Sequence, residues 1–234
     1  KEKMKKRRKN VILKYIKTIN KQLYIKMIEI PEKIKTFNFV LIDPNGDGKK
    51  PLEKCWQKKI HQFNDPILIN HLNKNYSYGV RGGGTSSIVI NGKSYFLIII
   101  DFDKKDFQDK IINLLPETFT TSSGSQKKCY HLWFASDNDK SFKILDENKE
   151  TLCDIISEGK QLLAPNSKHA SGSIYHTVKD IPFAFIPYAE LQALLLPFDR
   201  SPKKSLKEKK IPFIKNINNN ITDKLISGVT MKNI

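Results

Sequence analysis

The most regular hydrophobic pattern in the chain is an apolar run that ends in two aspartates. Tyr95–Ile100 is apolar throughout and rich in isoleucine, which predicts a β-strand buried on both faces. Asp101 and Asp103 follow, and side chains two residues apart on a strand point to the same face. Two adjacent carboxylates repel each other, so a hard cation such as Mg²⁺ is one expectation. The alternative is a strand that runs into a polar turn, where aspartate is common.

The segments before and after this strand predict a mixture of strands and helices. Asn91-Gly92 separates the strand from the apolar Ile88–Ile90, a pattern typical of a β-hairpin. Gly82–Gly84 is expected to be a flexible stretch whose backbone amides approach a ligand. The other predictions are a strand at 37–42, a tight turn at 43–48, an extended segment at 181–187, and helices at 11–30, 66–75, 106–115 and 188–196.

The second half of the chain offers a third candidate carboxylate and two basic loops. A second hairpin is expected to turn at Glu158–Lys160, with Asp154 at the start of its first strand. If the two predicted hairpins lie in one sheet, Asp154 can approach the first two aspartates; otherwise it is a surface residue. Lysines in a Ser/Gly-rich loop precede a short strand that begins at His131, and Pro165–Gly172 is basic and hydroxyl-rich. Both loops suit a polyanion.

The positive charge of the chain is concentrated at its two ends. The net charge is +17, of which residues 1–10 (seven basic residues, one acid) and 201–234 (eight basic, two acids) each supply +6. Such arms attract nucleic-acid phosphates without reading sequence, although solvated lysine-rich tails would look the same. Three cysteines without a C-x-x-C pair support neither a disulfide framework nor a zinc site, and they fit a reducing, cytoplasmic setting. No apolar run reaches the length of a membrane span.

The order of these segments resembles the archaeo-eukaryotic primase superfamily, and within it the primase–polymerase type. The matching segments are IIIDFD, SQKKCYHLWF and CDIISEG, followed by APNSKHASGSIY and preceded by GKKPLEKCW and YGVRGGG. They cover roughly residues 37–196. Two positions depart from the family pattern: Gln126 and Cys129 stand where one branch has glycines, and Cys129 replaces the serine of another branch.

The resemblance implies a DNA primase/polymerase that extends a primer, or an initiating nucleotide, on single-stranded DNA with NTPs or dNTPs. Asp101, Asp103 and Asp154 would hold two Mg²⁺ or Mn²⁺ ions for nucleotidyl transfer. Binding of the incoming nucleotide would fall to a set of basic and hydroxyl side chains: Lys128, His131, Lys168 and His169, with Ser125 and Ser167 as lesser contacts and Arg81 as a phosphate or template contact.

The resemblance also implies a fold and a division of the chain. We expect an α+β fold in which a mostly antiparallel, RRM-like sheet carries the acidic segments beside a smaller N-terminal α/β lobe. Residues 1–35 would form a basic arm and accessory helix, 36–200 the catalytic domain with two lobes and one cleft, and 201–234 a basic linker and tail. A helicase or helical domain is a possible partner in a longer protein.

Two other functions fit the same residues. A catalytically silent replication-initiation module would bind DNA through its basic arms without incorporating nucleotides. A metal-dependent nuclease would also cluster carboxylates, and it would degrade a labelled strand without added nucleotides. The sequence leaves open the choice between ribo- and deoxynucleotides, between Mg²⁺ and Mn²⁺, and between priming and extension alone.

Overall fold

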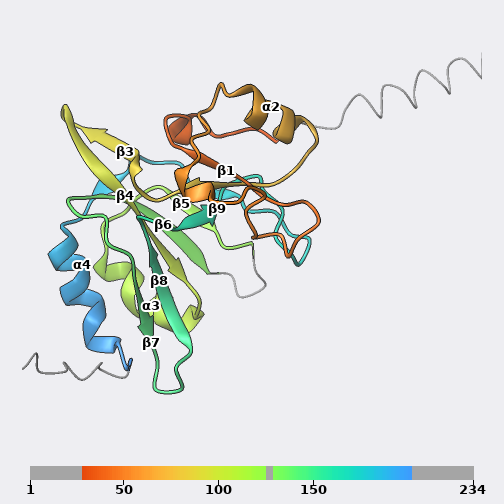
Figure 1. Cartoon of the computed structure of the whole chain (residues 1–234). Coiled ribbons are helices and arrows are strands. Elements are labelled where there is room, and N and C mark those ends of the chain that lie inside the picture. The colour runs from red at the N-terminus through yellow and green to blue at the C-terminus, as the bar shows by residue number, and fades with distance from the viewer. Residues whose placement is uncertain (1–27, 125–128, 202–234) are drawn as a thin grey trace, which may run out of the picture. The chain divides into compact units, whose positions relative to one another are not determined.

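The computed structural model describes residues 28–124 and 129–201 (Figure 1). Three predictions therefore lie outside the described residues: the helix at 11–30 except for its last three residues, the nucleotide contacts Ser125 and Lys128, and the tail beyond Ser201. No helix of the described part is both long and apolar enough to cross a bilayer.

Most of the described strands belong to one eight-stranded sheet. Its strands run in the order β10-β5-β6-β4-β8-β7, with β3 paired to β4 and β11 paired to β6. Every pairing is antiparallel except that of β11 with β6. The strands are β3 (Gly83–Ile90), β4 (Lys93–Phe102), β5 (Thr120–Ser122), β6 (Tyr130–Ser136), β7 (Phe142–Leu145), β8 (Thr151–Ile156), β10 (Thr177–Lys179) and β11 (Ala184–Phe185). The expected α+β class and antiparallel sheet are confirmed, whereas the RRM-like arrangement stays a prediction.

Strand β4 lies in the middle of this sheet, and its side chains alternate between two hydrophobic cores. Leu97 to Ile100 are completely buried. Ile98 and Ile100 pack in a cluster with helices α3 (Lys105–Ile111) and α4 (Tyr188–Leu195). Leu97 and Ile99 belong to the cluster on the opposite face, with residues of a second sheet. The strand is buried on both faces, as its continuous apolar pattern predicted.

The second sheet forms the smaller lobe. It has three antiparallel strands in the order β1-β2-β9 and is accompanied by helix α2 (Pro66–Asn73). The strands are β1 (Phe39–Leu41), β2 (Tyr78–Arg81) and β9 (Gln161–Leu163), and short 3-10 helices lie at Glu32–Ile34, Trp56–Lys58, Ile112–Leu114 and Leu196–Phe198. Its apolar side chains pack on the odd-numbered face of β4, so the two sheets share one core.

The predicted hairpin around Glu158–Lys160 is wrong, although both of its strands exist. Strand β8 pairs with β4 and β7, while β9 pairs with β2, so the chain passes from one sheet to the other at this turn. The chain also changes sheets at Gly82, between β2 and β3. These two crossings touch, because the Gly82 amide donates to the Lys160 carbonyl at 3.1 Å.

The structure gives Gly82 and Gly83 a packing role, and the expectation that the amides of Gly82–Gly84 approach a ligand stays a prediction. A Cβ on Gly82 would lie 2.6 Å from the Ser157 Cα, and one on Gly83 would lie 2.9 Å from the Glu158 Cα. The absence of side chains lets the two crossings lie against each other.

A buried histidine ties the start of α2 to the segment before it. His61 Nδ1 lies 2.6 Å from Asp65 Oδ2, and His61 Nε2 lies 2.6 Å from Glu53 Oε2. The other oxygen of Asp65 accepts the Ile67 amide at the helix N-terminus. Burial alone would lower the pKa of His61, but the hydrogen bonds and charges of the two carboxylates outweigh it and raise the pKa above 6.5. The hydrogen bond from His61 lowers the pKa of Asp65 below 3.8.

These shifts predict a pH window for the stability that His61 contributes. A raised histidine pKa stabilises the fold fully below 6.5, and this stability is lost as the pH rises through the folded-state value. On the acid side, the stability that ionised Asp65 contributes is lost as the pH falls through its folded-state pKa, which lies below 3.8. Near pH 6 the free energy of unfolding of the wild type should exceed that of His61→Gln by roughly 1.5–3 kcal/mol. Near pH 9 this difference should be clearly smaller. Urea unfolding at both pH values measures this, and an equal difference would contradict it.

Candidate active site

One row of polar side chains crosses three neighbouring strands of the large sheet. In the antiparallel register, Asp101 on β4 lies opposite His131 on β6 and opposite Asp154 on β8. Directly opposed residues in such a pair place their side chains on the same face. The previous row on this face is Ile99, opposite Trp133 and Ile156. The face that packs on the small lobe thus changes from apolar to charged within one step of the pleat.

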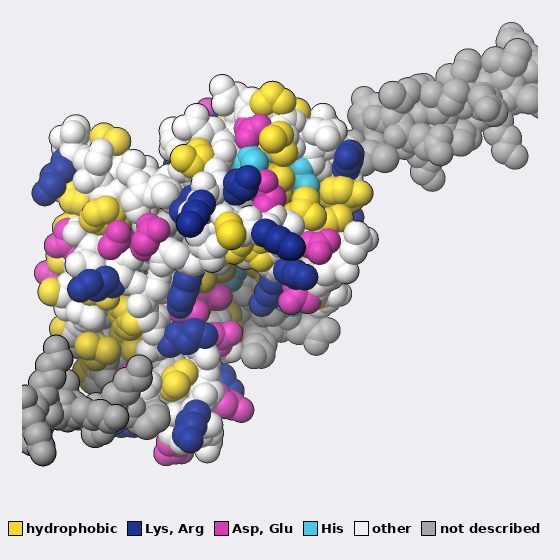
Figure 2. Space-filling model, in the orientation of Figure 1, with side chains coloured by type: hydrophobic (Ala, Val, Ile, Leu, Met, Phe, Trp, Pro, Cys, Tyr) yellow, Lys and Arg dark blue, Asp and Glu magenta, His cyan; other side chains and the backbone are white. Residues whose placement is uncertain are grey.

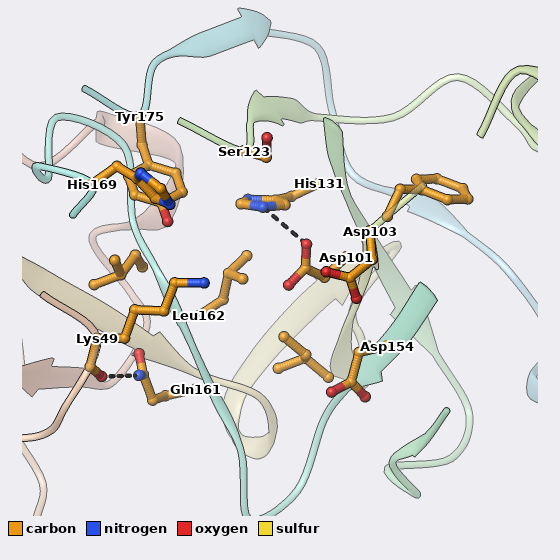
Figure 3. A pocket seen from close by; sticks show the side chains of 13 residues that line it. Lys49, Asp101, Asp103, Ser123, His131, Asp154, Gln161, Leu162, His169 and Tyr175 are labelled. Atoms are coloured by element: carbon orange, nitrogen blue, oxygen red, sulfur yellow. Dashed lines mark hydrogen bonds and ion pairs between the residues drawn. The ribbon is translucent and has the colours of Figure 1, made fainter. Parts of the chain in front are cut away.

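The polar row forms one wall of a cavity of about 440 Å³. Asp103, two residues beyond Asp101, also lines it, so all three predicted carboxylates share this space. In Figure 3 they lie with His131 on one side, while Lys49, His169 and Tyr175 lie on the other. The complete lining is Lys49, Asp101, Phe102, Asp103, Ser123, His131, Asp154, Ile156, Gln161, Leu162, Leu163, His169 and Tyr175.

Asp101 is held by His131 in a nearly buried contact. His131 Nε2 lies 3.1 Å from Asp101 Oδ1, and only 3% of the histidine side chain is exposed. The other ring nitrogen, Nδ1, lies 3.4 Å from the Thr121 hydroxyl, which also accepts the Trp133 indole N–H. Burial alone would raise the pKa of Asp101, but the charge and hydrogen bond of His131, with more distant lysines, outweigh it and lower the pKa. The carboxylate is therefore ionised in the site at neutral pH.

Asp154 is paired with two lysines of its own surroundings. Its carboxylate forms ion pairs with Lys160 and, at 3.5 Å, with Lys143 on β7. In this arrangement no three His, Cys, Asp or Glu side chains of the described residues are close enough together to hold a metal ion. The donor chemistry nevertheless fits a hard cation, because three carboxylates line one cavity and oxygen is the preferred ligand of Mg²⁺ and Mn²⁺. Lysine ammonium groups balance part of that charge here.

The basic loop predicted at Pro165–Gly172 closes the opposite wall as a tight hairpin over residues 167–175. His169 and Ser173 are joined by a 2.7 Å backbone hydrogen bond, and the Tyr175 amide donates to the Ser167 carbonyl. The ring of Tyr175 contacts two histidines, with ring centroids 5.6 Å from that of His131 and 5.7 Å from that of His169. Partial burial, together with the charges of Lys49 and His131, lowers the pKa of His169. The imidazole ring of His169 is therefore mainly uncharged at neutral pH.

Three predicted nucleotide contacts of the described region do not line this cavity. Ser167 is fully buried, and its hydroxyl donates to the Tyr78 carbonyl and accepts the Tyr78 amide, so it anchors the loop to β2. Arg81 is 5% exposed and donates to the Lys59 carbonyl at 2.8 Å. Lys168 instead lines a neighbouring cavity of about 590 Å³, which His169 also borders. Cys129 packs in the core with α3 and α4.

The sequence interpretation did not select four polar residues that line the cavity. They are Lys49, Ser123, Gln161 and Tyr175. Lys49 and Tyr175 lie within the quoted segments GKKPLEKCW and APNSKHASGSIY, so their neighbourhood carried a signal. Gln161 follows the crossing between the sheets, and no local pattern distinguishes it from another strand residue. On the face shown in Figure 2, lysine and arginine side chains lie among carboxylates where the small lobe meets the large sheet.

A cavity with clustered carboxylates on one wall and basic groups on the other is the kind of site that binds phosphorylated substrates. Comparison with known families is consistent with this class. A sequence model described as bifunctional DNA primase/polymerase, N-terminal (Prim-Pol), matches residues 32–191, about two thirds of the chain. The chain belongs to this family. None of the curated proteins compared with it gives a match.

Proposed function

We propose that this protein is a template-directed nucleotidyltransferase that joins NTPs or dNTPs to a primer 3′-OH, or to an initiating nucleotide, on single-stranded DNA. The observation that carries the proposal is the row Asp101–His131–Asp154, with Asp103 beside it, inside one cavity of a Prim-Pol domain. Separated segments of the chain thus bring three carboxylates to one wall, opposite basic residues.

The carboxylates provide the ligand chemistry that the reaction needs. Asp101, Asp103 and Asp154 would hold two Mg²⁺ or Mn²⁺ ions, which when bound activate the attacking hydroxyl and stabilise the pyrophosphate leaving group. Asp101 is well suited to this role because His131 keeps it ionised and fixes its orientation. Asp154 would exchange its ion pairs with Lys143 and Lys160 for that role.

The remaining side chains would bind the substrates. His131 and His169 face the cavity from opposite walls, and Lys168 borders the neighbouring cavity, so these groups would contact the phosphates of the incoming nucleotide. Lys128 and Ser125 would belong to the same set by their place in the sequence. The basic segments 1–10 and 201–234 would hold the template through its phosphates, with a strong dependence on salt.

Incorporation of a labelled nucleotide by the full chain tests the proposal. Reactions on single-stranded DNA, with and without a primer and with Mg²⁺ or Mn²⁺, should give products that follow the template sequence and disappear when EDTA is added. Template binding without incorporation in either metal would favour the silent DNA-binding module. Degradation of the labelled strand in the absence of nucleotides would favour the nuclease.

A further inference from the structure

Lys49 belongs to a turn whose backbone is fixed on both sides of the residue. The Asp47 carboxylate accepts the amides of Lys49 and Lys50, each at 2.9 Å. The Lys49 carbonyl accepts a 3.0 Å hydrogen bond from Gln161 Nε2 on β9. The turn is further closed by a backbone hydrogen bond from Asp43 to Lys50. A lysine on an exposed turn is ordinarily free to move, whereas the main chain of Lys49 is held in place.

Gln161 uses only one end of its side-chain amide to reach Lys49. Its amide oxygen lies over Gly79 on β2, 2.1 Å from the position that a Cβ on that residue would take. That oxygen is buried and has no hydrogen-bond partner among the described residues. Buried polar atoms without partners are uncommon and unfavourable. The one hydrogen bond that the Gln161 side-chain amide makes among the described residues is therefore the one that holds the backbone of Lys49.

The ammonium group of Lys49 faces the carboxylates from the opposite wall. It lines the same cavity as Asp101 and His169. Lys143 and Lys160, by contrast, form ion pairs with Asp154. Within residues 28–124 and 129–201, no carboxylate lies within ion-pair distance of Lys49. A positive charge in the cavity is therefore available to an anionic ligand.

We propose that Lys49 binds the terminal phosphates of the incoming nucleoside triphosphate and that Gln161 is the positioning residue that holds it there. This inference rests on the proposed function. The bond that breaks lies between the α- and β-phosphates, so the α-phosphate belongs beside the carboxylates. The rest of the triphosphate then extends across the cavity toward the wall that carries Lys49. An ammonium group at that wall neutralises the negative charge of the terminal phosphates, which the carboxylate wall cannot do.

Binding of nucleotides that differ only in phosphate number tests this directly. Calorimetry on the full chain in Mg²⁺, with an α,β-imido nucleoside triphosphate and the matching monophosphate, needs no turnover. Lys49→Ala should weaken triphosphate binding about 10- to 100-fold and leave monophosphate binding unchanged. Lys49→Arg should restore most of the affinity, and Lys50→Ala, which removes the neighbouring exposed lysine, should behave as wild type. An equal loss for both nucleotides, or an equal effect of Lys50→Ala, would overturn the proposal.

Gln161→Ala separates positioning from general stability. It should raise the KM for the triphosphate several-fold, leave kcat and the thermal unfolding midpoint near wild type, and have no further effect in a Lys49→Ala background. An additive loss in the double variant would refute the role of Gln161. If wild type prefers the triphosphate through Lys49 but incorporates nothing, the proposed function fails and the phosphate site stands. If Lys49→Ala incorporates nucleotides with an unchanged KM, only the phosphate site fails.

Discussion

Asp101→Asn is expected to reduce nucleotide incorporation by on the order of 10³-fold while leaving the fold intact. Asp101 is the central member of the polar row, opposite both His131 and Asp154. Asparagine has the same shape, and its amide oxygen can still accept the histidine N–H. The substitution thus removes the negative charge that a metal ion requires and changes little else. Primer extension with saturating nucleotide, in Mg²⁺ and in Mn²⁺, measures the loss.

Glu147→Gln is the matched control for this experiment. It removes one negative charge from an exposed residue in the turn between β7 and β8, outside the cavity. It should extend primers as wild type does, and both variants should bind single-stranded DNA and unfold at the wild-type temperature. Near-normal extension by Asp101→Asn would contradict the role of the carboxylate row, whatever the result for the control.

Gly82→Ala is expected to destabilise the fold by about 3 kcal/mol, at the upper end of the effect of overpacking. The new methyl group would lie 2.6 Å from both the Cα and the carbonyl oxygen of Ser157. These are backbone atoms at the other crossing between the sheets, so they cannot move aside as a flexible side chain would. The shift would also break the hydrogen bond from Gly82 to Lys160. Chemical denaturation of the variant and the wild type gives the difference.

Gly46→Ala provides the comparison for Gly82→Ala. A Cβ at this position would meet its nearest neighbours at 3.4 to 3.6 Å, which is ordinary van der Waals contact. Its effect should stay below about 1 kcal/mol, because a turn residue of this kind has room for a methyl group. Similar losses for the two variants would mean that the contact between the crossings does not limit stability.

The parts of the fold that the sequence predicted are those set by local periodicity. The apolar run of β4 required burial on both faces, and Asn91-Gly92 required the turn that pairs it with β3. Helices α2 and α4 follow from apolar stripes and from prolines near their ends. The position of Asp101 and Asp103 on one face needed only the two-residue repeat of a strand.

The errors arise where distant residues decide the structure. Two strands joined by a short polar turn have the same sequence pattern whether they pair as a hairpin or belong to different sheets. Here the packing of Gly82 against Ser157 separates β8 from β9. Strand β5 was not predicted because it has only three residues and none of them is apolar. Its Thr121 is nonetheless fully buried, and its hydroxyl satisfies Trp133.

The same limit applies to the candidate site. Arg81 and Ser167 are residue types that often bind phosphate, yet here Arg81 donates to the Lys59 carbonyl and Ser167 bonds to both backbone groups of Tyr78. Lys49 was overlooked because nothing near it in the sequence reveals the hydrogen bond from Gln161, 112 residues away. Asp154 depended on which strands pair, and β8 pairing with β4 brought it opposite Asp101.

The alternation of side chains between the two faces of β4 also limits where residues can be inserted or deleted in the protein. One added residue between Tyr95 and Asp101 would exchange the two faces of the strand and turn the carboxylate toward the helices. The bend at 146–149 joins two neighbouring strands and has exposed residues, so it can gain or lose residues without that penalty. Insertions and deletions are therefore tolerated at the rim of the sheet and excluded from its central strand.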